Sequence, residues 1–315
     1  MRRAPLLAAA LLAAGFLVVQ LRSIDSYGES LEEEASLYRG DVTAHYLHSL
    51  LTGRDSVLDD RIHALSAVSH PAAFEALNYA AYRIARRSGM GEIPAGHLLI
   101  VVAGSLAIFF LFLAGRFLVG DAAALAAAFF FALDPPWIFH AQVNPTEAPA
   151  VAASLFALWL AFRARERPTA LRWVVAGLAF GAAIDCGFQT LLALPLVVWA
   201  ALAPYDKPLD LRDRRHGARL AFAAAGAAVG AYLCWPSLWD DPLSICLVPI
   251  HLLGSSWSGF VLYGGHFYEP PDLPWHYGVG MLAAATPCLH LIFAAAGAAV
   301  LARRSGRFAK TSLAM

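Results

Sequence analysis

The stretch HLLIVVAGSLAIFFLFLAGRFLV, residues 97–119, decides the class of fold, because its only charged residue is Arg116. A helix that crosses a bilayer needs about 20 mostly apolar residues, since lipid offers no hydrogen-bond partner to the backbone. The whole chain of 315 residues is 59% hydrophobic and 15% charged. An ordinary soluble domain is about 25% charged. The sequence therefore predicts an all-α integral membrane protein.

Further apolar stretches resemble this one, and together they predict a multi-pass protein. We expect eight transmembrane helices in a single membrane domain over 1–315, at about 4–21, 97–119, 121–137, 148–163, 171–185, 188–203, 218–236 and 277–302. The fifth and sixth are short and are expected to form a tight or tilted pair. The first follows a charged start that signal peptides share, and we expect it to remain as an anchor.

The basic residues predict the orientation, because Lys and Arg accumulate in cytoplasmic segments. With the N-terminus in the cytoplasm, 16 of the 23 basic residues fall on that side, and the other seven lie between Arg22 and Arg87. Eight spans place both termini in the cytoplasm. The rich use of Ala and Arg indicates a bacterial source, hence the inner membrane. The formal net charge is +0, which gives no indication of a nucleic-acid partner.

Most acids and histidines fall on the opposite, extracytoplasmic side, and such groups transfer protons and bind ligands. Two large outer segments carry them, 22–96 and 236–276. The first contains two stretches with helical patterns, 30–52 and 70–87. The second of these is amphipathic, which is typical of interfacial helices that lie along the membrane surface. We therefore expect the functional site on the extracytoplasmic face.

The first motif on that face is an acidic cluster soon after the first span. It reads Glu32-Glu33-Glu34, followed by Tyr38 and Asp41. Adjacent carboxylates repel one another, which makes one of them a candidate proton acceptor. The alternative is a solvated helix start, because the helix dipole favours acids there.

Three later motifs could bind a ligand or could be structural. His70 precedes Pro71, and a proline in a first helical turn is usually structural. Prolines 135 and 136 end one span, and Glu147 opens the next as either a site residue or a helix-start acid. The last motif, residues 263–277, is rich in aromatic residues, which form interfacial anchors and also pack against sugar C–H surfaces.

Taken in this order, the motifs resemble the lipid-linked sugar transferases of the GT-C class. The nearest group is the superfamily of protein O-mannosyltransferases and aminoarabinose transferases. The matching elements are Glu33-Glu34 with Tyr38, His70-Pro71, Pro135 with Glu147, and Leu273-Pro274-Trp275-His276-Tyr277 before Thr286-Pro287. The Gly-rich fifth span and Pro195 also fit the pattern.

The chain departs from the family pattern at three positions. Glu33 replaces the family's Asp, and Ala72 replaces the second Pro of His-Pro-Pro. Gln189 lies where relatives often carry a basic residue.

The resemblance implies transfer of a sugar from a polyprenyl-phosphate donor to a lipid, glycan or protein acceptor at the outer face of the bilayer. The implied base is Glu33 or Glu34, with Asp41 behind them. The implied donor and phosphate-binding residues are Tyr38, Arg39, Arg61, His70 and Arg83. The implied sugar or lipid cleft holds Glu147, His266, Tyr268, Trp275 and His276. No cofactor is certain, and a divalent metal stays open.

Two other classes of protein remain as alternatives. A non-catalytic or truncated relative would keep the fold, and the departures at Glu33, Ala72 and Gln189 are consistent with it. A transporter would carry buried charges and broken helices in matched halves. The spans show neither matched halves nor many charges, so we favour the transferase.

Overall fold

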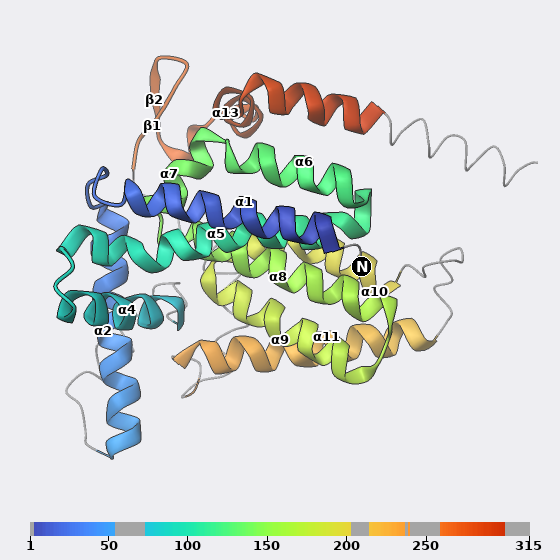
Figure 1. Ribbon diagram of the computed structural model, residues 1–315, viewed down its shortest axis with the longest axis horizontal. Helices are drawn as coiled ribbons and strands as arrows, with labels where there is room; N and C mark the ends of the chain where they lie inside the picture. The colour runs from blue at the N-terminus through green and yellow to red at the C-terminus, as the bar shows by residue number, and fades with distance from the viewer. Residues whose placement is uncertain (1–2, 54–72, 203–213, 237–238, 240–258, 300–315) are drawn as a thin grey trace, which may run out of the picture. The chain divides into compact units, whose positions relative to one another are not determined.

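The computed structural model describes residues 3–53, 73–202, 214–236, 239 and 259–299. The chain divides into two compact units, Met1–Leu252 and Leu253–Met315, and each is described by itself. The described residues are predominantly helical (Figure 1), so the chain is an all-α membrane protein, as its composition predicts. The expectation of one membrane domain over 1–315 stays a prediction.

Four helices of the first unit are long and apolar enough to cross a membrane. They are α1 (Arg3–Arg22), α5 (Glu92–Val119), α8 (Glu147–Glu166) and α11 (Arg214–Cys234). Two bent pairs of helices raise the number to six among the described residues, if each pair is one span. The expected eight spans thus exceed what length and composition support in these residues, and the count of eight stays a prediction.

The third expected span, 121–137, is broken near its end. Helix α6 (Asp121–Ala132) and helix α7 (Pro135–Val143) meet at an angle of 67°. Prolines 135 and 136 cannot continue the hydrogen bonding of α6, and Asp134 caps α7 by accepting the backbone N–H of Trp137 at 3.3 Å. After the bend, α7 packs mainly against α5.

The fifth and sixth expected spans correspond to short helices. Helix α9 (Ala170–Cys186) has 17 residues, which at 1.5 Å each gives about 26 Å, against about 30 Å of hydrocarbon. It is followed by a 3₁₀ helix, η1 (Phe188–Ala193), and then by α10 (Leu194–Leu202). Pro195 lies in the first turn of α10, where a missing N–H is tolerated and a new helix begins.

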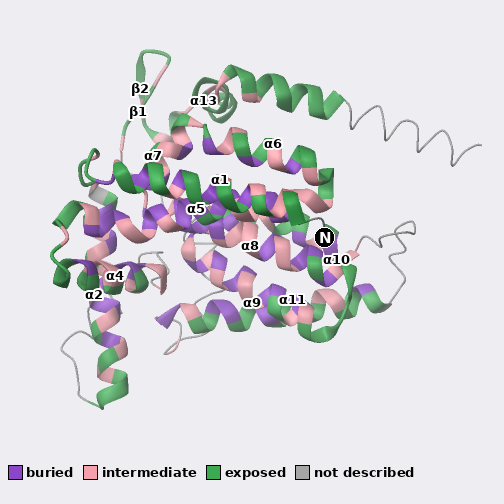
Figure 2. Ribbon diagram, in the orientation of Figure 1, coloured by how far each residue is buried: buried purple, intermediate pink, exposed green. Residues whose placement is uncertain are grey.

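Two clusters of buried side chains hold the first unit together (Figure 2). One joins α1 with α5–α8 around Ile100, Ile108 and Phe112 of α5. The other joins α8 with α9–α11 around Phe162 and Trp173. Most other members are alanines, and small residues let helices approach closely where lipid supplies no hydrophobic driving force.

Helices α9 and α11 interlock through glycines from both sides. A Cβ on Gly177 or Gly181 would collide with the carbonyl oxygens of Ala223 and Ala227 on α11. A Cβ on Gly226 or Gly230 would collide in turn with the carbonyl oxygens of Val174 and Leu178 on α9. Both pairs of glycines are four residues apart, the spacing of close helix contacts in membranes.

The segment before α5 contains the two helices expected there, as far as it is described. Helix α2 (Leu31–Thr52) begins at Ser30, which forms a capping box with Glu33. Helix α4 (Ala73–Arg87) packs against α2 and α5. In Figure 1, α2 runs across the direction that α1, α5 and α8 share. Such an orientation suits a helix that lies in the plane of a membrane surface.

The first element among the described residues of the second unit is a β-hairpin, β1 (Val261–Tyr263) and β2 (His266–Tyr268). Gly264 and Gly265 make the turn with φ of 59° and 84°, which favours glycine at both positions. A short 3₁₀ helix, η4 (Pro270–Asp272), leads to α13 (Tyr277–Ala285). A bend of 113° separates α13 from the helix Cys288–Ala299, so the eighth expected span, 277–302, is also broken.

The glycine contacts predict opposite effects for two substitutions on α11. Gly226→Ala places a methyl group against the backbone of α9, and we expect it to lower the free energy of unfolding by about 1–3 kcal/mol. Gly217→Ala meets nothing within 4 Å, and we expect a neutral effect or a gain of about 0.5–1 kcal/mol. Thermal unfolding of the two purified variants in detergent measures the difference. Equal midpoints would contradict the interlock.

Candidate functional site

Polar contacts join several helices at one end of the first unit, which we call the α2 end. Ser30 Oγ donates to the carbonyl oxygen of Val143 at 3.1 Å, which ties the start of α2 to α7. His97 Nδ1 lies 2.8 Å from the carbonyl oxygen of Ile24, which ties α5 to the end of α1. These contacts fix where α2 begins relative to the bundle.

Glu33, an expected base, is buried at the α2 end and engaged on both oxygens. Its Oε2 accepts the backbone N–H of Ser30 at 2.8 Å, and its Oε1 lies 2.9 Å from His97 Nε2. The same imidazole contacts the carbonyl oxygen of Ile24 through Nδ1, so it lies between Glu33 and the residues that follow α1. Glu33 therefore anchors α2 to α5.

One face of α2 carries the other sequence-predicted residues of the acidic cluster. Glu34, Tyr38 and Asp41 are spaced by four and three residues, so they share a helix face that continues to His45. Glu34, Tyr38 and His45 are exposed and Asp41 is half-buried. The packed face of the same helix holds Glu33, Ser36, Gly40 and Thr43, all buried. The cluster is thus divided between an anchoring face and an accessible face.

Asp41 and Arg83 are brought together through Tyr79 of α4. The Tyr79 hydroxyl accepts from Arg83 Nη1 at 2.6 Å, and it donates to Asp41. Burial raises the pKa of Tyr79, and the hydrogen bond to Asp41 raises it further. Asp41 Oδ1 also lies 3.3 Å from His45 Nε2. Two of the expected residues thus belong to one network of charged groups.

Arg39, expected to bind phosphate, is already paired with Glu75. Its Nε donates to both carboxylate oxygens of Glu75, at 2.8 and 3.0 Å. Both side chains are largely buried, with 18% and 7% of their surfaces exposed. Gly40 makes the pairing possible, because a Cβ there would collide with the carbonyl oxygen of Glu75. Burial raises the pKa of Glu75, and the bond to Arg39 offsets only part of that effect.

Glu147 lies at the first turn of α8 and contacts a histidine. Its Oε2 lies 3.2 Å from His140 Nδ1, and both side chains are partly exposed. Asn144 holds the turn by accepting the backbone N–H groups of Thr146 and Glu147 at 3.0 and 2.7 Å. Glu147 therefore combines a helix-start position with a polar partner.

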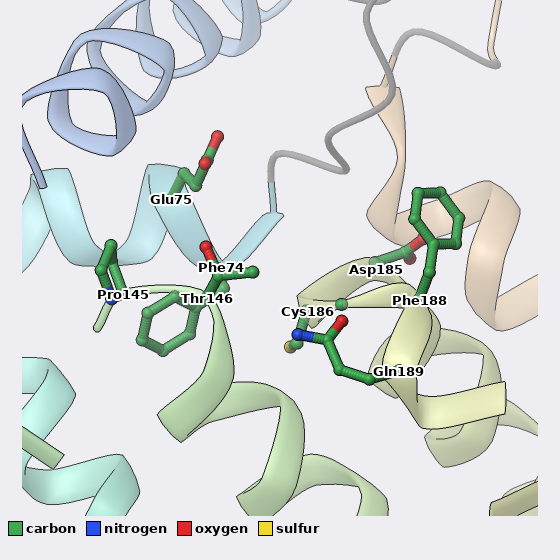
Figure 3. Close-up of a pocket in the computed structure, with 9 residues that line it drawn as sticks. Phe74, Glu75, Pro145, Thr146, Asp185, Cys186, Phe188 and Gln189 are labelled. Carbon is green, nitrogen blue, oxygen red and sulfur yellow. The ribbon is translucent and has the colours of Figure 1, made fainter. Parts of the chain in front are cut away.

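A small cavity of about 50 Å³ lies where α4, the α7–α8 connection and the end of α9 meet (Figure 3). Its lining comprises Phe74, Glu75, Pro145, Thr146, Asp185, Cys186, Gly187, Phe188 and Gln189. Asp185 is 1% exposed, and neither of its carboxylate oxygens has a hydrogen-bond partner among the described residues. The cavity thus combines aromatic rings with polar side chains.

The aromatic residues expected to line a cleft belong to the second unit. His266 and Tyr268 lie on β2, and Trp275 and His276 precede α13. The ring of Tyr263 lies 5.7 Å from that of His276, which packs the hairpin on the start of α13. These residues form a local aromatic cluster within their own unit.

Two expected residues, Arg61 and His70, lie outside the described residues. Within the described part of the chain, no group of three or more His, Cys, Asp or Glu side chains is placed to hold a metal ion.

The buried polar residues that sequence reasoning missed include Glu75, His97 and Asp185. Each lies in or beside an apolar helical stretch, where a lone polar residue is a signal for an intramembrane partner or ligand. That signal was present for Asp185 at the end of the fifth expected span. Glu75 and His97 have partners from α2, which no spacing in the sequence indicates.

The Arg39–Glu75 pair predicts an asymmetric response to substitution. Arg39→Met leaves a buried carboxylate without its partner, and we expect a loss of about 3–5 kcal/mol in the free energy of unfolding. Arg39→Met combined with Glu75→Leu removes both charges, and we expect most of the stability to return. Denaturant unfolding measures both, with the exposed Arg87→Met as a matched control. A single variant as stable as the control would disprove the role of the pair.

The raised pKa of Glu75 also predicts a dependence on pH. Above the unfolded value of 4.5 the unfolded chain loses its proton first, while the folded carboxyl keeps it. The stability of the wild type relative to Glu75→Gln is therefore expected to fall as the pH rises above 4.5, and to level off above the folded pKa. Unfolding of both proteins across this range tests the sign.

Comparison with known proteins places the chain in a family. The model of the dolichyl-phosphate-mannose-protein mannosyltransferase family matches residues 75–235, about half of the chain. The match runs from Glu75 on α4 through α11 and includes Thr146, Asp185 and Gln189 of the cavity. No curated protein and no solved structure matches the chain. The chain therefore belongs to the dolichyl-phosphate-mannose-protein mannosyltransferase family, a family of membrane glycosyltransferases of the GT-C type.

Proposed function

We propose that the chain transfers a sugar from a polyprenyl-phosphate donor to a lipid, glycan or protein acceptor at the extracytoplasmic face of a membrane. The observation that carries this proposal is the accessible face of α2. It holds Glu34, Tyr38 and Asp41 at the end of an apolar bundle that belongs to a glycosyltransferase family.

A lipid-linked donor requires an apolar surface next to a polar site. The prenyl chain remains in the bilayer, while the phosphate and sugar reach the interface. Helix α2 lies across the bundle and carries carboxylates, an arginine and histidines (Figure 1). This arrangement supports a site at the level of the lipid headgroups.

Glu34 is the carboxylate that we favour as the base, with Asp41 as the second candidate. Glu33 fits this role less well, because His97 and Ser30 already engage its two oxygens. Glu34 would take the proton of the acceptor hydroxyl. The acceptor oxygen then bonds to the anomeric carbon as the bond to the phosphate breaks, and the prenyl phosphate leaves with the electron pair.

The departing phosphate needs hydrogen bonds or positive charge. Arg83 is the better placed of the two expected arginines that are described, because it is exposed and lies beside Tyr79 and Asp41. Arg39 is occupied by Glu75. We keep Tyr38 as a donor contact and Arg61 and His70 as further phosphate candidates. We also keep Glu147, His266, Tyr268, Trp275 and His276 as residues of the sugar or lipid cleft.

The distribution of basic residues supports the orientation in this proposal. Lys and Arg flank the opposite ends of the spans, including Arg116 at the end of α5 and Arg163 and Arg165 at the end of α8. By the positive-inside tendency those ends face the cytoplasm, which leaves the α2 end outside. We place the protein in the bacterial inner membrane with both termini in the cytoplasm.

The test is sugar release from a panel of polyprenyl-phosphate sugars by proteoliposomes that contain the full chain. We expect Glu34→Gln to reduce turnover by about 10²–10⁴-fold without changing the unfolding midpoint, as removal of a general base does. Glu33→Gln is expected to lower the unfolding midpoint, because His97 loses its carboxylate. Glu32→Gln, an exposed acid in the same helical turn, is the control.

The outcomes separate the alternatives. Turnover that survives Glu34→Gln and Asp41→Asn would overturn the assignment of the base. Absence of turnover with every donor, from protein shown to be folded and inserted, would favour the non-catalytic relative.

A further inference from the structure

Two cysteines end the two interlocked helices of the first unit. Cys186 is the last residue of α9, and Cys234 is the last residue of α11. The two helices run in the same direction, because their glycine contacts advance together along both of them. Both helices therefore end at the same side of the bundle. This is the α2 end, since Cys186 lines the cavity beside Glu75, which Arg39 of α2 binds (Figure 3).

The register of the glycine contacts places the two cysteines side by side. Residues four apart on α11 meet carbonyl oxygens four apart on α9, as Gly226 meets Val174 and Gly230 meets Leu178. The next step of four residues brings Cys234 to the carbonyl group of Ala182. The thiol of Cys186 donates a hydrogen bond to that same carbonyl oxygen at 3.5 Å. Both cysteine side chains thus converge on one backbone group of α9.

The spacing of the two backbones suits a covalent link. A disulfide joins Cα atoms that are about 4.4–6.8 Å apart. At Gly230, one turn before Cys234, a Cβ would collide with the carbonyl oxygen of Leu178, so the helix backbones are in contact there. The thiols of Cys186 and Cys234 also lie close enough to interact electrostatically. We therefore expect side-chain rotation to be enough for the two sulfur atoms to bond.

Two other roles for the cysteines fit less well. A structural thiol is typically a fully buried, small apolar residue, whereas Cys186 and Cys234 are partly exposed free thiols. A metal ion needs several ligands, and the described residues contain no group of three or more His, Cys, Asp or Glu side chains placed to hold one. Two accessible thiols from neighbouring helices are better suited to a disulfide.

We propose that Cys186 and Cys234 form a disulfide that joins the outer ends of α9 and α11. The proposal rests on the orientation proposed above, which places these ends outside the cytoplasm, and it is independent of sugar transfer. Disulfides form and persist in oxidising compartments such as the bacterial periplasm, while cytoplasmic thiols stay reduced. In the opposite orientation both cysteines would remain thiols.

The oxidant is the disulfide of an extracytoplasmic thiol oxidoreductase or of a small molecule. The thiolate of one cysteine attacks that disulfide, breaks its S–S bond and forms a mixed disulfide. The thiolate of the other cysteine then attacks the sulfur of the first, and the oxidant leaves. Overall the two cysteines lose two electrons and two protons, which convert the disulfide of the oxidant into two thiols.

The bond closes a loop of the chain that contains η1 and α10. A cross-link of this kind stabilises a protein mainly by restricting the unfolded chain. It also holds the end of α9 against α11. Because residues 185–189 form one wall of the cavity, the disulfide fixes that wall in place.

The test traps the thiols of the full chain in the membranes of a bacterial host. Rapid acid quenching is followed by alkylation with N-ethylmaleimide in denaturant, without reductant, and then by digestion and mass spectrometry. We expect a pair of peptides linked through Cys186 and Cys234, lighter by two hydrogens than the reduced peptides, and protection of both positions until a reductant is added. Cys186→Ser is expected to leave Cys234 open to alkylation, and Cys234→Ser to leave Cys186 open.

A second measurement asks whether the bond stabilises the fold. We expect a reductant to lower the unfolding midpoint of the purified wild type by roughly 5 °C or more. The midpoint of the Cys186→Ser/Cys234→Ser double variant is expected to stay the same with and without reductant. Cys288→Ser, at an exposed thiol of the second unit, is the matched control and is expected to keep both the linked peptides and the wild-type response.

Free thiols at both positions in the membranes would overturn the proposal, and so would a link from Cys234 to Cys246, which lies outside the described residues. In the first case, oxidised glutathione added to the purified protein shows which premise fails. Linkage of Cys186 to Cys234 would mean that the two ends face a reducing compartment, and no linkage would mean that the register does not bring the sulfur atoms together. Neither readout involves sugar transfer, so the test gives the same answer for a non-catalytic relative.

Discussion

The crossing of α2 over α4 at Gly40 is the contact on which the geometry of the α2 end depends. No side chain fits between the backbone of Gly40 and the carbonyl group of Glu75. Because the two helices touch at the backbone, Arg39 reaches the carboxylate of Glu75 with two hydrogen bonds from Nε. The same crossing brings Tyr79 beside Asp41. Because Gly40 has no side chain, α2 and α4 approach closely, and this approach sets the distances between their charged groups.

The charged groups at the α2 end differ in how deeply they are buried. The deeper ones, Glu33 and Arg39, are bound to partners and hold α2 on the bundle. The shallower ones on the other face of α2 remain accessible to solvent. This division reconciles two demands, since the helix needs buried polar contacts for a fixed position and a reaction needs groups that a substrate can reach. Glu33 and Glu34 are therefore adjacent in the sequence but differ in role, since Glu33 is a structural anchor and Glu34 is accessible.

The sequence predicted the helical class and the location of most helices well, because long runs of apolar residues are visible in the sequence itself. It predicted the helix at 30–52 from its pattern, and the structure has α2 at Leu31–Thr52. It indicated that Pro135 and Pro136 end a span, but it did not predict the bend of 67° into α7 or the break after Ala285, where Pro287 interrupts an otherwise apolar run. It also treated Glu33 and Glu34 alike. Their difference arises from His97, which is 64 positions further along the chain and is brought near only by the fold.

The interlocking glycines of α9 and α11 have a consequence for how the chain is assembled in the membrane. Helix α9 is complete at Cys186, whereas its partner is complete only at Cys234. During synthesis the glycine face of α9 therefore has no partner until α11 has left the ribosome. Over that interval α9, with Asp185 at its end, must be accommodated by the insertion machinery or by α8. The final burial of the fifth apolar segment is thus a late event in the biogenesis of this protein.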